Sequence, residues 1–192
     1  MKFSRKLFWI KKRFSWNYKY FIGKWDYIEN QNTRYNKIVE HVNYCNINNP
    51  KILDLGCGFG SLCKYLNEDD FSSLLGVDLS DTAIAKAKKK KYSNTNFIVA
   101  DIQKFETNEK FDIIILNEVI YYLDDYLETL SRFSKFFKNE NGYFIISIYG
   151  VREDIIEKVS TQYELIKTDK VLKVDNNAYW GITLFKYNKH KN

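Results

Sequence analysis

Three glycines and two aspartates are spaced in this chain as if to hold a small molecule. Gly56, Gly58 and Gly60 are three of its eight glycines, lie within five positions, and directly follow an apolar run. Asp54 precedes them, and Asp78 follows the next apolar run. Glycine lets the backbone adopt positive φ and approach a ligand closely, whereas a tight turn without a ligand needs only one glycine. The pattern predicts a binding loop flanked by two carboxylates.

The spacing also bears on the class of ligand. A carboxylate at the position of Asp78 can accept hydrogen bonds from the ribose hydroxyls of an adenosine-bearing cofactor. In the dinucleotide pattern G-x-G-x-x-G a pyrophosphate binds at the helix that follows, but here Gly60 comes one residue early and Ser61 replaces the last glycine. Asp54 would also repel a pyrophosphate. A phosphate-free adenosyl cofactor with an amino group and a positive sulfur suits Asp54 better, and S-adenosylmethionine is such a molecule.

The rest of the chain must supply the elements that position these residues. Apolar runs rich in Ile, Leu and Val predict strands buried on both faces, as in a parallel sheet, at 51–55, 73–77, 96–100, 111–116 and 142–149. Helical patterns lie between them at 60–68, 81–91, 124–138 and 151–160, with Ser80 as an N-cap. Residues 163–174 and 178–188 flank the turn signal "DNN" and predict an antiparallel hairpin. The order predicts a doubly wound α/β fold with helices on both faces of the sheet and the hairpin at one edge.

Length and charge indicate one domain with a basic arm. The chain has 192 residues and a net charge of +6, and its first 24 residues contain eight Lys or Arg and no acid. We expect a helical, aromatic arm or lid at 1–45 and a cofactor-binding domain at 46–192. The cysteines Cys45, Cys57 and Cys63 lack zinc-ligand spacing, so we expect reduced thiols, no metal site and a cytoplasmic protein. No signal peptide is expected, and no run approaches the ~20 apolar residues that cross a bilayer.

Four motifs in order carry a family resemblance. The segments "LDLGCGFG" (53–60), "GVDLS" (76–80), "VADIQKF" (99–105) and "FDIIILNEVIYYL" (111–123) resemble those of the class I SAM-dependent methyltransferases, over residues 50–187. The resemblance implies a Rossmann-like, seven-stranded, mostly parallel sheet with one antiparallel strand. It also implies S-adenosyl-L-methionine as cofactor and S-adenosyl-L-homocysteine as product.

The same resemblance implies a set of cofactor-binding residues. It implies that the glycine loop contacts the cofactor, that the end of the second strand binds the ribose, and that the segment after the third strand binds the adenine. It also implies that the segment after the fourth strand contacts the methionine end of the cofactor and that residues 24–35 form a lid. The residues implied are Asp54, Gly56, Cys57, Gly58, Gly60, Asp78, Leu79, Asp101, Ile102, Asn117, Trp25, Tyr27 and Arg34. Two have simpler alternatives, because Asp101 could cap a helix and Ile102 could belong to the core.

The segment after the fourth strand supplies the candidate catalytic residues. Methyl transfer depends mainly on alignment of the reacting atoms and needs a base only when the nucleophile arrives protonated. Glu118 is the candidate acid/base or substrate anchor, with a structural carboxylate as the alternative. Tyr121 and Tyr122 could line the methyl path, where aromatic faces favour cations. We expect one of them in the core, because adjacent residues leaving a strand rarely point the same way.

The acceptor is predicted from one short stretch. "EVIYYL" (118–123) resembles the NodS-like enzymes, which N-methylate amino-sugar oligosaccharides. We therefore expect a methyltransferase acting on an amine or hydroxyl of a small molecule or glycan precursor, as in polysaccharide biosynthesis. The sequence leaves open an RNA methyltransferase using the basic arm, an NAD-dependent oxidoreductase and a non-catalytic binding protein. The Asp/Asn-Pro-Pro-aromatic signature of base N-methylation is missing, and Pro50 is the only proline, so nucleic acid is disfavoured.

The basic arm has three interpretations. Phe3, Leu7, Ile10 and Phe14 recur at helical spacing among basic and aromatic residues. The arm could pack on the domain or a partner. Residues 1–22 could instead contact anionic lipid at the inner membrane face, or the arm could contact nucleic acid through basic and stacking side chains. Of the two histidines, His41 on a helix at 33–45 is expected to be a surface or packing residue, and His190 to be inert.

Overall fold

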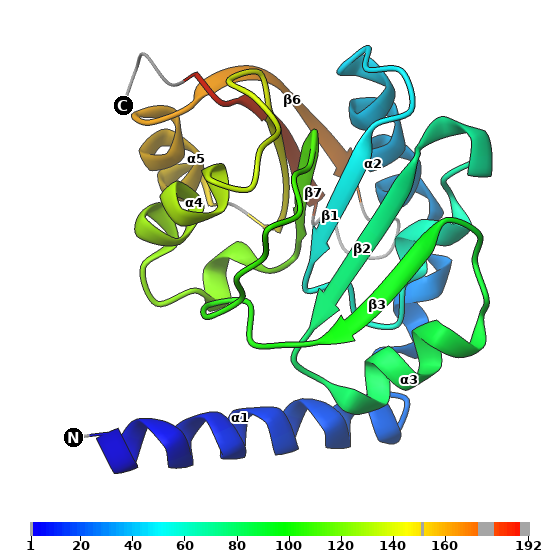
Figure 1. Cartoon of the computed structure of the whole chain (residues 1–192), viewed down its shortest axis with the longest axis vertical. Coiled ribbons are helices and arrows are strands. Elements are labelled where there is room, and N and C mark those ends of the chain that lie inside the picture. The colour runs from blue at the N-terminus through cyan, green and yellow to red at the C-terminus, as the bar shows by residue number, and fades with distance from the viewer. Residues whose placement is uncertain (1, 151, 173–178, 189–192) are drawn as a thin grey trace.

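The fold is built on one twisted sheet with helices on both faces (Figure 1). The computed structural model describes residues 2–150, 152–172 and 179–188, with side chains from residue 10 onward. The sheet has seven strands in the order β3-β2-β1-β4-β5-β7-β6. Strand order therefore reverses beside β1, where β2 and β4 are its two neighbours. Ligands of open α/β sheets bind outside the carboxyl ends of the strands at such a point.

The predicted strands are confirmed. Five run parallel: β1 (Lys51–Leu55), β2 (Ser73–Asp78), β3 (Thr95–Val99), β4 (Ile113–Asn117) and β5 (Tyr143–Tyr149). The predicted antiparallel pair is β6 (Glu164–Leu172) and β7 (Tyr179–Lys186), and β7 also pairs antiparallel with β5. The turn predicted at 175–177 lies outside the described residues. The predicted doubly wound, mostly parallel seven-stranded fold with one antiparallel strand is thus confirmed.

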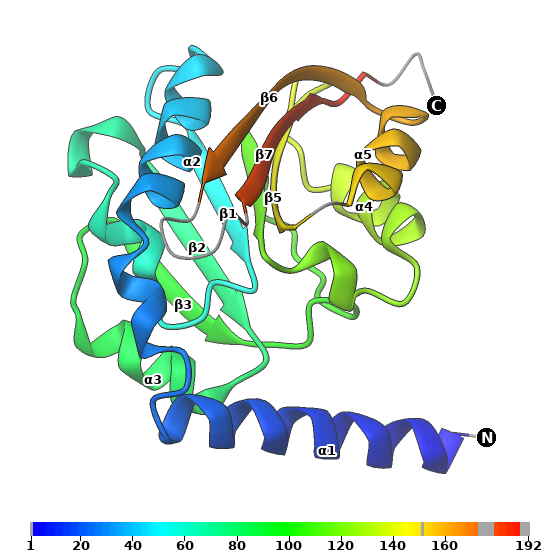
Figure 2. The ribbon, with the colours of Figure 1, turned by 180° about the vertical axis from the view of Figure 1, so that it is seen from behind.

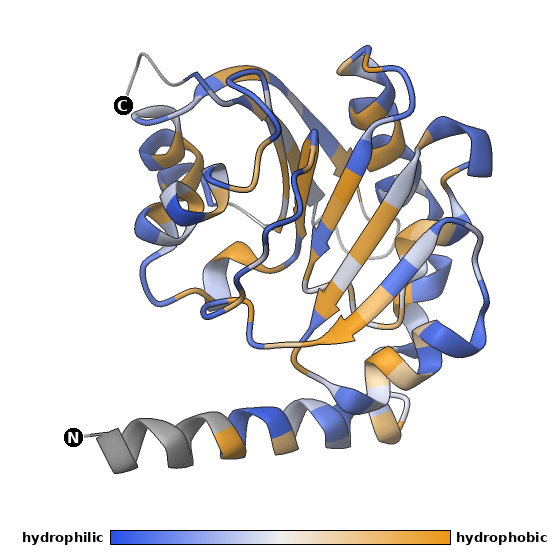
Figure 3. Cartoon of the chain, viewed as in Figure 1, coloured by the Kyte–Doolittle hydropathy of each residue, from blue (hydrophilic) through white to orange (hydrophobic). Residues whose placement is uncertain are grey.

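Two apolar cores lie on opposite faces of the sheet, because side chains alternate along each strand. In β1, Leu53 and Leu55 face one core and Ile52 faces the other. The helices α4 (Tyr126–Ser134) and α5 (Glu153–Ser160) cover the first core, and α2 (Asn32–Tyr44) and α3 (Asp81–Lys89) contribute to the second, as Figure 2 shows from behind. Figure 3 shows hydrophobic colour gathered on the strands and hydrophilic colour on outer turns and loops.

Two predicted helices differ from those observed. Residues 60–68 form no α-helix but two 3-10 turns, Ser61–Lys64 and Glu68–Asp70. The segment starts at a left-handed glycine and ends in the polar run 67–70, which offers no apolar face to pack a helix against the core. The helix expected at 124–138 ends at Ser134, because Phe137 instead forms a bridge with Phe111 beside β4.

The N-terminal region is helical, as expected. Helix α1 (Lys2–Phe21) is followed by a 3-10 turn (Asp26–Asn30) and by α2. Figures 1 and 2 show α1 crossing below the carboxyl ends of β1, β2 and β3, while α2 lies against the sheet. None of the described helices is long and apolar enough to cross a membrane. The region therefore places one helix on the core and another across the end of the sheet where a ligand would bind.

Candidate active site

A cavity of about 560 Å³ lies at the carboxyl ends of the central strands. Its walls come from the ends of β1, β2 and β4, the loops after β3 and β5, and the start of β7. The N-terminal region closes it through Lys12, Trp16 and Tyr20 of α1 and through the segment leading into α2. Residues from almost the whole length of the chain therefore meet at one site.

The glycine loop adopts the conformation that its residue types predict. The φ values of Gly56, Gly58 and Gly60 are 75°, 55° and 72°, in the left-handed region that residues with a side chain rarely adopt. A Cβ on Gly56 would lie 2.3 Å from Cγ2 of Val119, and one on Gly58 would lie 2.8 Å from the Tyr20 hydroxyl. Gly56 and Gly58 line the cavity together with Cys57, but Gly60 does not. Gly60 faces Phe97 at 2.9 Å instead, so its role here is close packing beneath the loop.

The two aspartates lie at the ends of adjacent strands, and burial raises the pKa of both. The pKa of Asp54 rises to about 7 through burial and through the charge of Asp78. The pKa of Asp78 rises to about 6 through burial, against the lowering effect of backbone hydrogen bonds. Asp78 Oδ2 accepts from Gly58 N (3.0 Å) and Oδ1 from Ser80 N (2.8 Å). Neither carboxylate has a basic partner among the described residues, and such a buried pair favours a cationic or hydrogen-bond-donating ligand.

Buried polar atoms without partners are concentrated at this cavity. Among the described side chains, seven such atoms have no hydrogen-bond partner, and six belong to residues that line the cavity. Two are donors, on Trp25 and Arg34, and the other four are acceptors, on Gln31, Asp54, Asp101 and Asn117. Since buried polar groups are nearly always paired, these atoms indicate a ligand that bears both donors and acceptors.

The residues expected near an adenine ring lie at the cavity after β3. Asp101 Oδ1 accepts from Gln103 N (3.1 Å) and caps a turn. No helix begins at this point, so the helix-cap alternative does not hold. Asp101 Oδ2 accepts no hydrogen bond and lies 3.7 Å from Lys104 Nζ. Ile102 lines the cavity and also packs against the core, so both of its interpretations hold. Leu79 lines the cavity beside the end of β2.

The lid residues expected from the sequence also line the cavity. Trp25, Tyr27 and Arg34 all contribute to its wall. Arg34 is only 3% exposed, and its guanidinium lies 5.0 Å from the Tyr35 ring and 5.2 Å from the Trp180 ring. No ion pair joins it to a carboxylate among the described residues. A buried guanidinium in this state is suited to bind an anion such as a ligand carboxylate.

The candidate catalytic residues form one hydrogen-bonded group. Glu118 has a φ of 63°, rare for a residue with a side chain. Its Oε2 accepts from the Tyr121 hydroxyl (2.8 Å) and its Oε1 from Ser147 Oγ (3.3 Å). Burial raises the pKa of Glu118, while Arg34 and these hydrogen bonds lower it. Burial and the nearby Glu118 raise the pKa of Tyr121 well above its ordinary value.

The expectation that Tyr121 or Tyr122 belongs to the core holds in part, because Tyr121 packs against the core but also faces the cavity. Both line the cavity, with ring centroids 4.7 Å apart. Residues 120–122 form a 3-10 turn rather than an extended segment, so neighbouring side chains need not alternate. Tyr122 is 41% exposed, which places it towards the outer part of the site.

Sequence reasoning missed several aromatic residues of the site. Trp16 stacks on Trp25 (5.9 Å) and meets Tyr122 edge-on (5.4 Å). Tyr149 and Trp180, which are paired across β5 and β7, lie 5.5 Å apart at the cavity. The aromatic composition of the arm was a signal for Trp16, but nothing local marked Tyr149 or Trp180. The cavity therefore combines a polar floor with aromatic walls.

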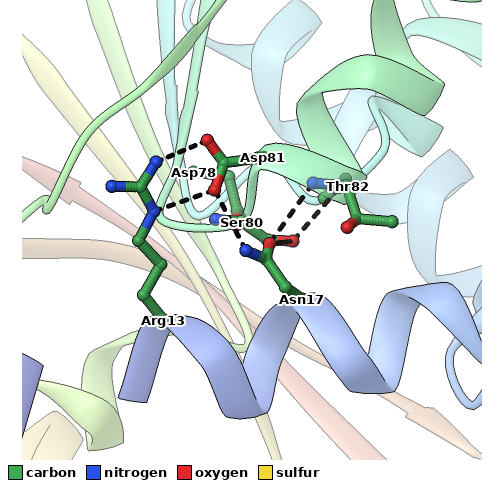
Figure 4. A network of polar contacts seen from close by, with 7 residues as sticks. Arg13, Asn17, Asp78, Ser80, Asp81 and Thr82 are labelled. Atoms are coloured by element: carbon green, nitrogen blue, oxygen red, sulfur yellow. Dashed lines mark hydrogen bonds and ion pairs between the residues drawn. The ribbon is translucent and has the colours of Figure 1, made fainter. Parts of the chain in front are cut away.

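A polar network fixes α1 over the site, as Figure 4 shows. Arg13 donates two hydrogen bonds to the Asp81 carboxylate, one from Nε to Oδ2 (2.8 Å) and one from Nη2 to Oδ1. Asn17 donates to the same carboxylate (3.0 Å) and accepts from Ser80 Oγ (2.6 Å) and Thr82 N (3.3 Å). The Arg13 guanidinium lowers the pKa of Asp81 to about 2. Because Ser80 also binds Asp78 through its backbone, the network connects α1 to the cavity.

The remaining candidates lie elsewhere or outside the described residues. His41 is fully buried on α2, with Nε2 at 2.9 Å from Asp169 Oδ2 on β6, so it is a packing residue. His190 lies outside the described residues. The cysteines are free thiols, and the described residues hold no group of three or more His, Cys, Asp or Glu able to bind a metal.

Comparisons with known proteins agree with this geometry. A family profile described as a methyltransferase domain matches residues 47–187. Nodulation protein S of Sinorhizobium fredii is 37% identical over 75 residues, covering 38% of this chain and 34% of that protein. Malonyl-[acyl-carrier protein] O-methyltransferase of Anoxybacillus flavithermus is 33% identical over 103 residues, covering 53% and 39%. The matched part of the chain thus spans less than half the length of these relatives.

One solved structure illustrates the likeness of fold. The crystal structure of the N-methyltransferase NodS from Bradyrhizobium japonicum has a TM-score of 0.69, and the similarity covers 81% of this chain and 95% of that one at 19% identity. The strand order and the closing antiparallel pair described above are therefore those of a known architecture.

Proposed function

Because this chain belongs to the methyltransferase-domain family, we propose that it transfers the methyl group of S-adenosylmethionine to an amine of a small molecule or glycan precursor. The observation that carries the proposal is the set of unpaired buried polar atoms around the cavity. Their chemistry fits this cofactor, which offers an amino group, a carboxylate, two ribose hydroxyls and an adenine amino group. The match favours methyl transfer over the nicotinamide alternative, whose pyrophosphate would lie against Asp54.

Each part of the cofactor has a counterpart among these residues. The unpaired Asp54 Oδ1 suits the amino group, and Arg34 and Trp25 are donors suited to the carboxylate. Asp78 uses its two oxygens to order the loop, and each keeps a lone pair for a ribose hydroxyl. Asp101 Oδ2 suits the adenine amino group, and the bare backbone of Gly56 and Gly58 allows close approach.

The chemistry of the acceptor would rest on Glu118. When bound, S-adenosylmethionine supplies a methyl group on positive sulfur, and the carbon–sulfur bond breaks with its electron pair passing to sulfur. Glu118 would take up the proton that the acceptor nitrogen gives up on methylation. Burial raises its pKa, which makes it a better proton acceptor than an exposed carboxylate. Tyr121 orients the carboxylate through the 2.8 Å hydrogen bond.

The walls of the cavity support an amine acceptor. Tyr121, Tyr122, Tyr27 and Tyr149 all line the cavity that Glu118 borders. Aromatic faces attract cations and also stack on the apolar faces of sugar rings. Relatives named as N- and as O-methyltransferases both occur, so the carboxylate and the aromatic walls are the features that favour nitrogen.

Two measurements test the proposal. Isothermal titration calorimetry of the full chain with S-adenosylmethionine tests the cofactor. Release of S-adenosylhomocysteine in the presence of glucosamine oligomers, arylalkylamines, catechols and carboxylic acids tests the acceptor. We expect binding of the cofactor and turnover with at least one amine. Glu118→Gln should lower kcat by about 100-fold, as for loss of a general base, without changing cofactor affinity.

A matched variant separates catalysis from loss of charge. Glu128 is an exposed carboxylate on α4, so Glu128→Gln should retain full turnover. No heat with the cofactor would overturn the cofactor assignment. Turnover with hydroxyl or carboxyl acceptors alone, or an undiminished kcat in Glu118→Gln, would overturn the choice of an amine.

A further inference from the structure

Helix α1 presents an apolar stripe to the outside of the molecule. Ile10, Phe14, Tyr18 and Phe21 are 58%, 74%, 58% and 77% exposed. They recur at intervals of four, four and three residues, which places them on one face of the helix. In Figure 3 no other element lies below the coloured part of α1. Single exposed apolar residues are ordinary, but a continuous stripe marks an interaction surface.

The neighbouring face of α1 is already used. Arg13 and Asn17 bind the start of α3, Tyr20 is buried against Phe59, and Trp16 lines the cavity. Lys86 Nζ donates to the Tyr20 carbonyl (2.9 Å) at the end of the helix. The helix is thus held in one orientation, and that orientation turns the stripe outward. Burial against this chain's own domain does not explain the stripe.

The charges within residues 1–24 have a single sign. The first 24 residues carry eight basic side chains and no acidic one, whereas the rest of the chain carries two more acidic than basic residues. Lys11 and Lys24 are exposed, and Lys19 lies 4.4 Å from the Trp16 ring. An apolar stripe flanked by basic residues is the pattern of helices that lie in the interface of an anionic membrane.

We propose that the outward face of α1 docks on an anionic lipid surface. A second copy of the chain is a poorer occupant, because pairing two stripes would bring two acid-free basic helices together. Nucleic acid is also poorer, because the centre of the stripe is apolar and includes the aliphatic Ile10, whereas phosphate contacts need charge at the centre. Docking in this way would leave the cofactor cavity on the other side of the same helix. The proposal does not depend on which acceptor is methylated.

Vesicle sedimentation of the full chain tests this proposal. We expect binding to phosphatidylglycerol/phosphatidylcholine vesicles, weak binding to pure phosphatidylcholine, and loss of binding as NaCl rises to about 0.5 M. The double variant Phe14→Ser, Phe21→Ser should lower the partition coefficient by about tenfold or more, because two large apolar side chains no longer enter the interface. Its calorimetric affinity for S-adenosylmethionine should match that of the wild type, which checks the fold.

A control variant changes an exposed apolar residue elsewhere. Leu172 on β6 is 69% exposed, so Leu172→Ser should bind vesicles as the wild type does. Equal vesicle binding by the double variant and the wild type would overturn the proposal, as would no binding to anionic vesicles. Sedimentation velocity showing a dimer that the double variant dissociates would assign the stripe to a second copy. Binding of a short single-stranded RNA that the double variant abolishes, with no vesicle binding, would assign it to nucleic acid.

Discussion

The substitution Asp54→Asn should stabilise the cofactor-free protein and weaken its cofactor binding. Asp54 is 2% exposed, its Oδ1 has no hydrogen-bond partner, and burial raises its pKa from 3.8 to about 7. The folded chain therefore keeps a proton on Asp54 that the unfolded chain releases. The stability linked to this proton is fully present below about pH 4 and is lost as pH rises through about pH 7. A shift of about three units corresponds to about 4 kcal/mol at pH 8.

Thermal unfolding across pH measures this effect. Between about pH 5 and pH 8 the wild type should lose about 3 kcal/mol of unfolding free energy through Asp54, and Asp54→Asn should keep it. At about 2–4 °C per kcal/mol, the variant should melt roughly 10 °C above the wild type at pH 8. Loss of a charged acceptor for the cofactor amino group should weaken S-adenosylmethionine binding by about 10- to 100-fold, as read by calorimetry.

A surface carboxylate provides the control. Asp69 is exposed, so Asp69→Asn should leave both the melting temperature and the cofactor affinity unchanged. The reasoning fails if Asp54→Asn melts at or below the wild-type temperature at pH 8. It also fails if the variant binds the cofactor as tightly as the wild type does.

Three further predictions follow from the site. Asp78→Ala should weaken cofactor binding by about 100-fold or more, because it removes a charged acceptor for two hydroxyls; unchanged affinity by calorimetry would contradict the ribose assignment. Gly56→Ala should lower the free energy of unfolding by about 2–4 kcal/mol, because the new Cβ meets Val119 and φ is left-handed. The control Gly150→Ala should lower it by only about 1 kcal/mol, because Gly150 has a φ of 79° but open space around it. Equal melting temperatures of the two variants would refute this. Tyr121→Phe should raise the pKa of Glu118, because the variant loses the hydrogen bond that lowers this pKa. The acidic limb of the pH profile of methyl transfer should therefore move to higher pH. An unchanged acidic limb would argue against Glu118 as the base.

Much of the fold could be predicted because its signals are local. The buried strands are continuous apolar runs, and the N-cap of α3 is a Ser whose hydroxyl accepts from the backbone three residues on. The helix predicted at 60–68 failed for an equally local reason, since its first residue is a left-handed glycine. The early end of α4 was different in kind. It depends on the bridge between Phe111 and Phe137, which the local sequence pattern does not predict.

The site divides in the same way. The sequence by itself determined the glycine loop, the carboxylates at the ends of two strands and the residues of the active-site segment, because backbone preference and strand periodicity act over a few residues. Only the tertiary structure decided that Trp180 joins the cavity through its pairing with Tyr149 on β5. It also decided that Asp54 is buried without a partner and that α1 turns one face to the cavity and the other outward. Burial, pKa and contacts between distant residues depend on how the elements pack, and packing is a property of the whole chain.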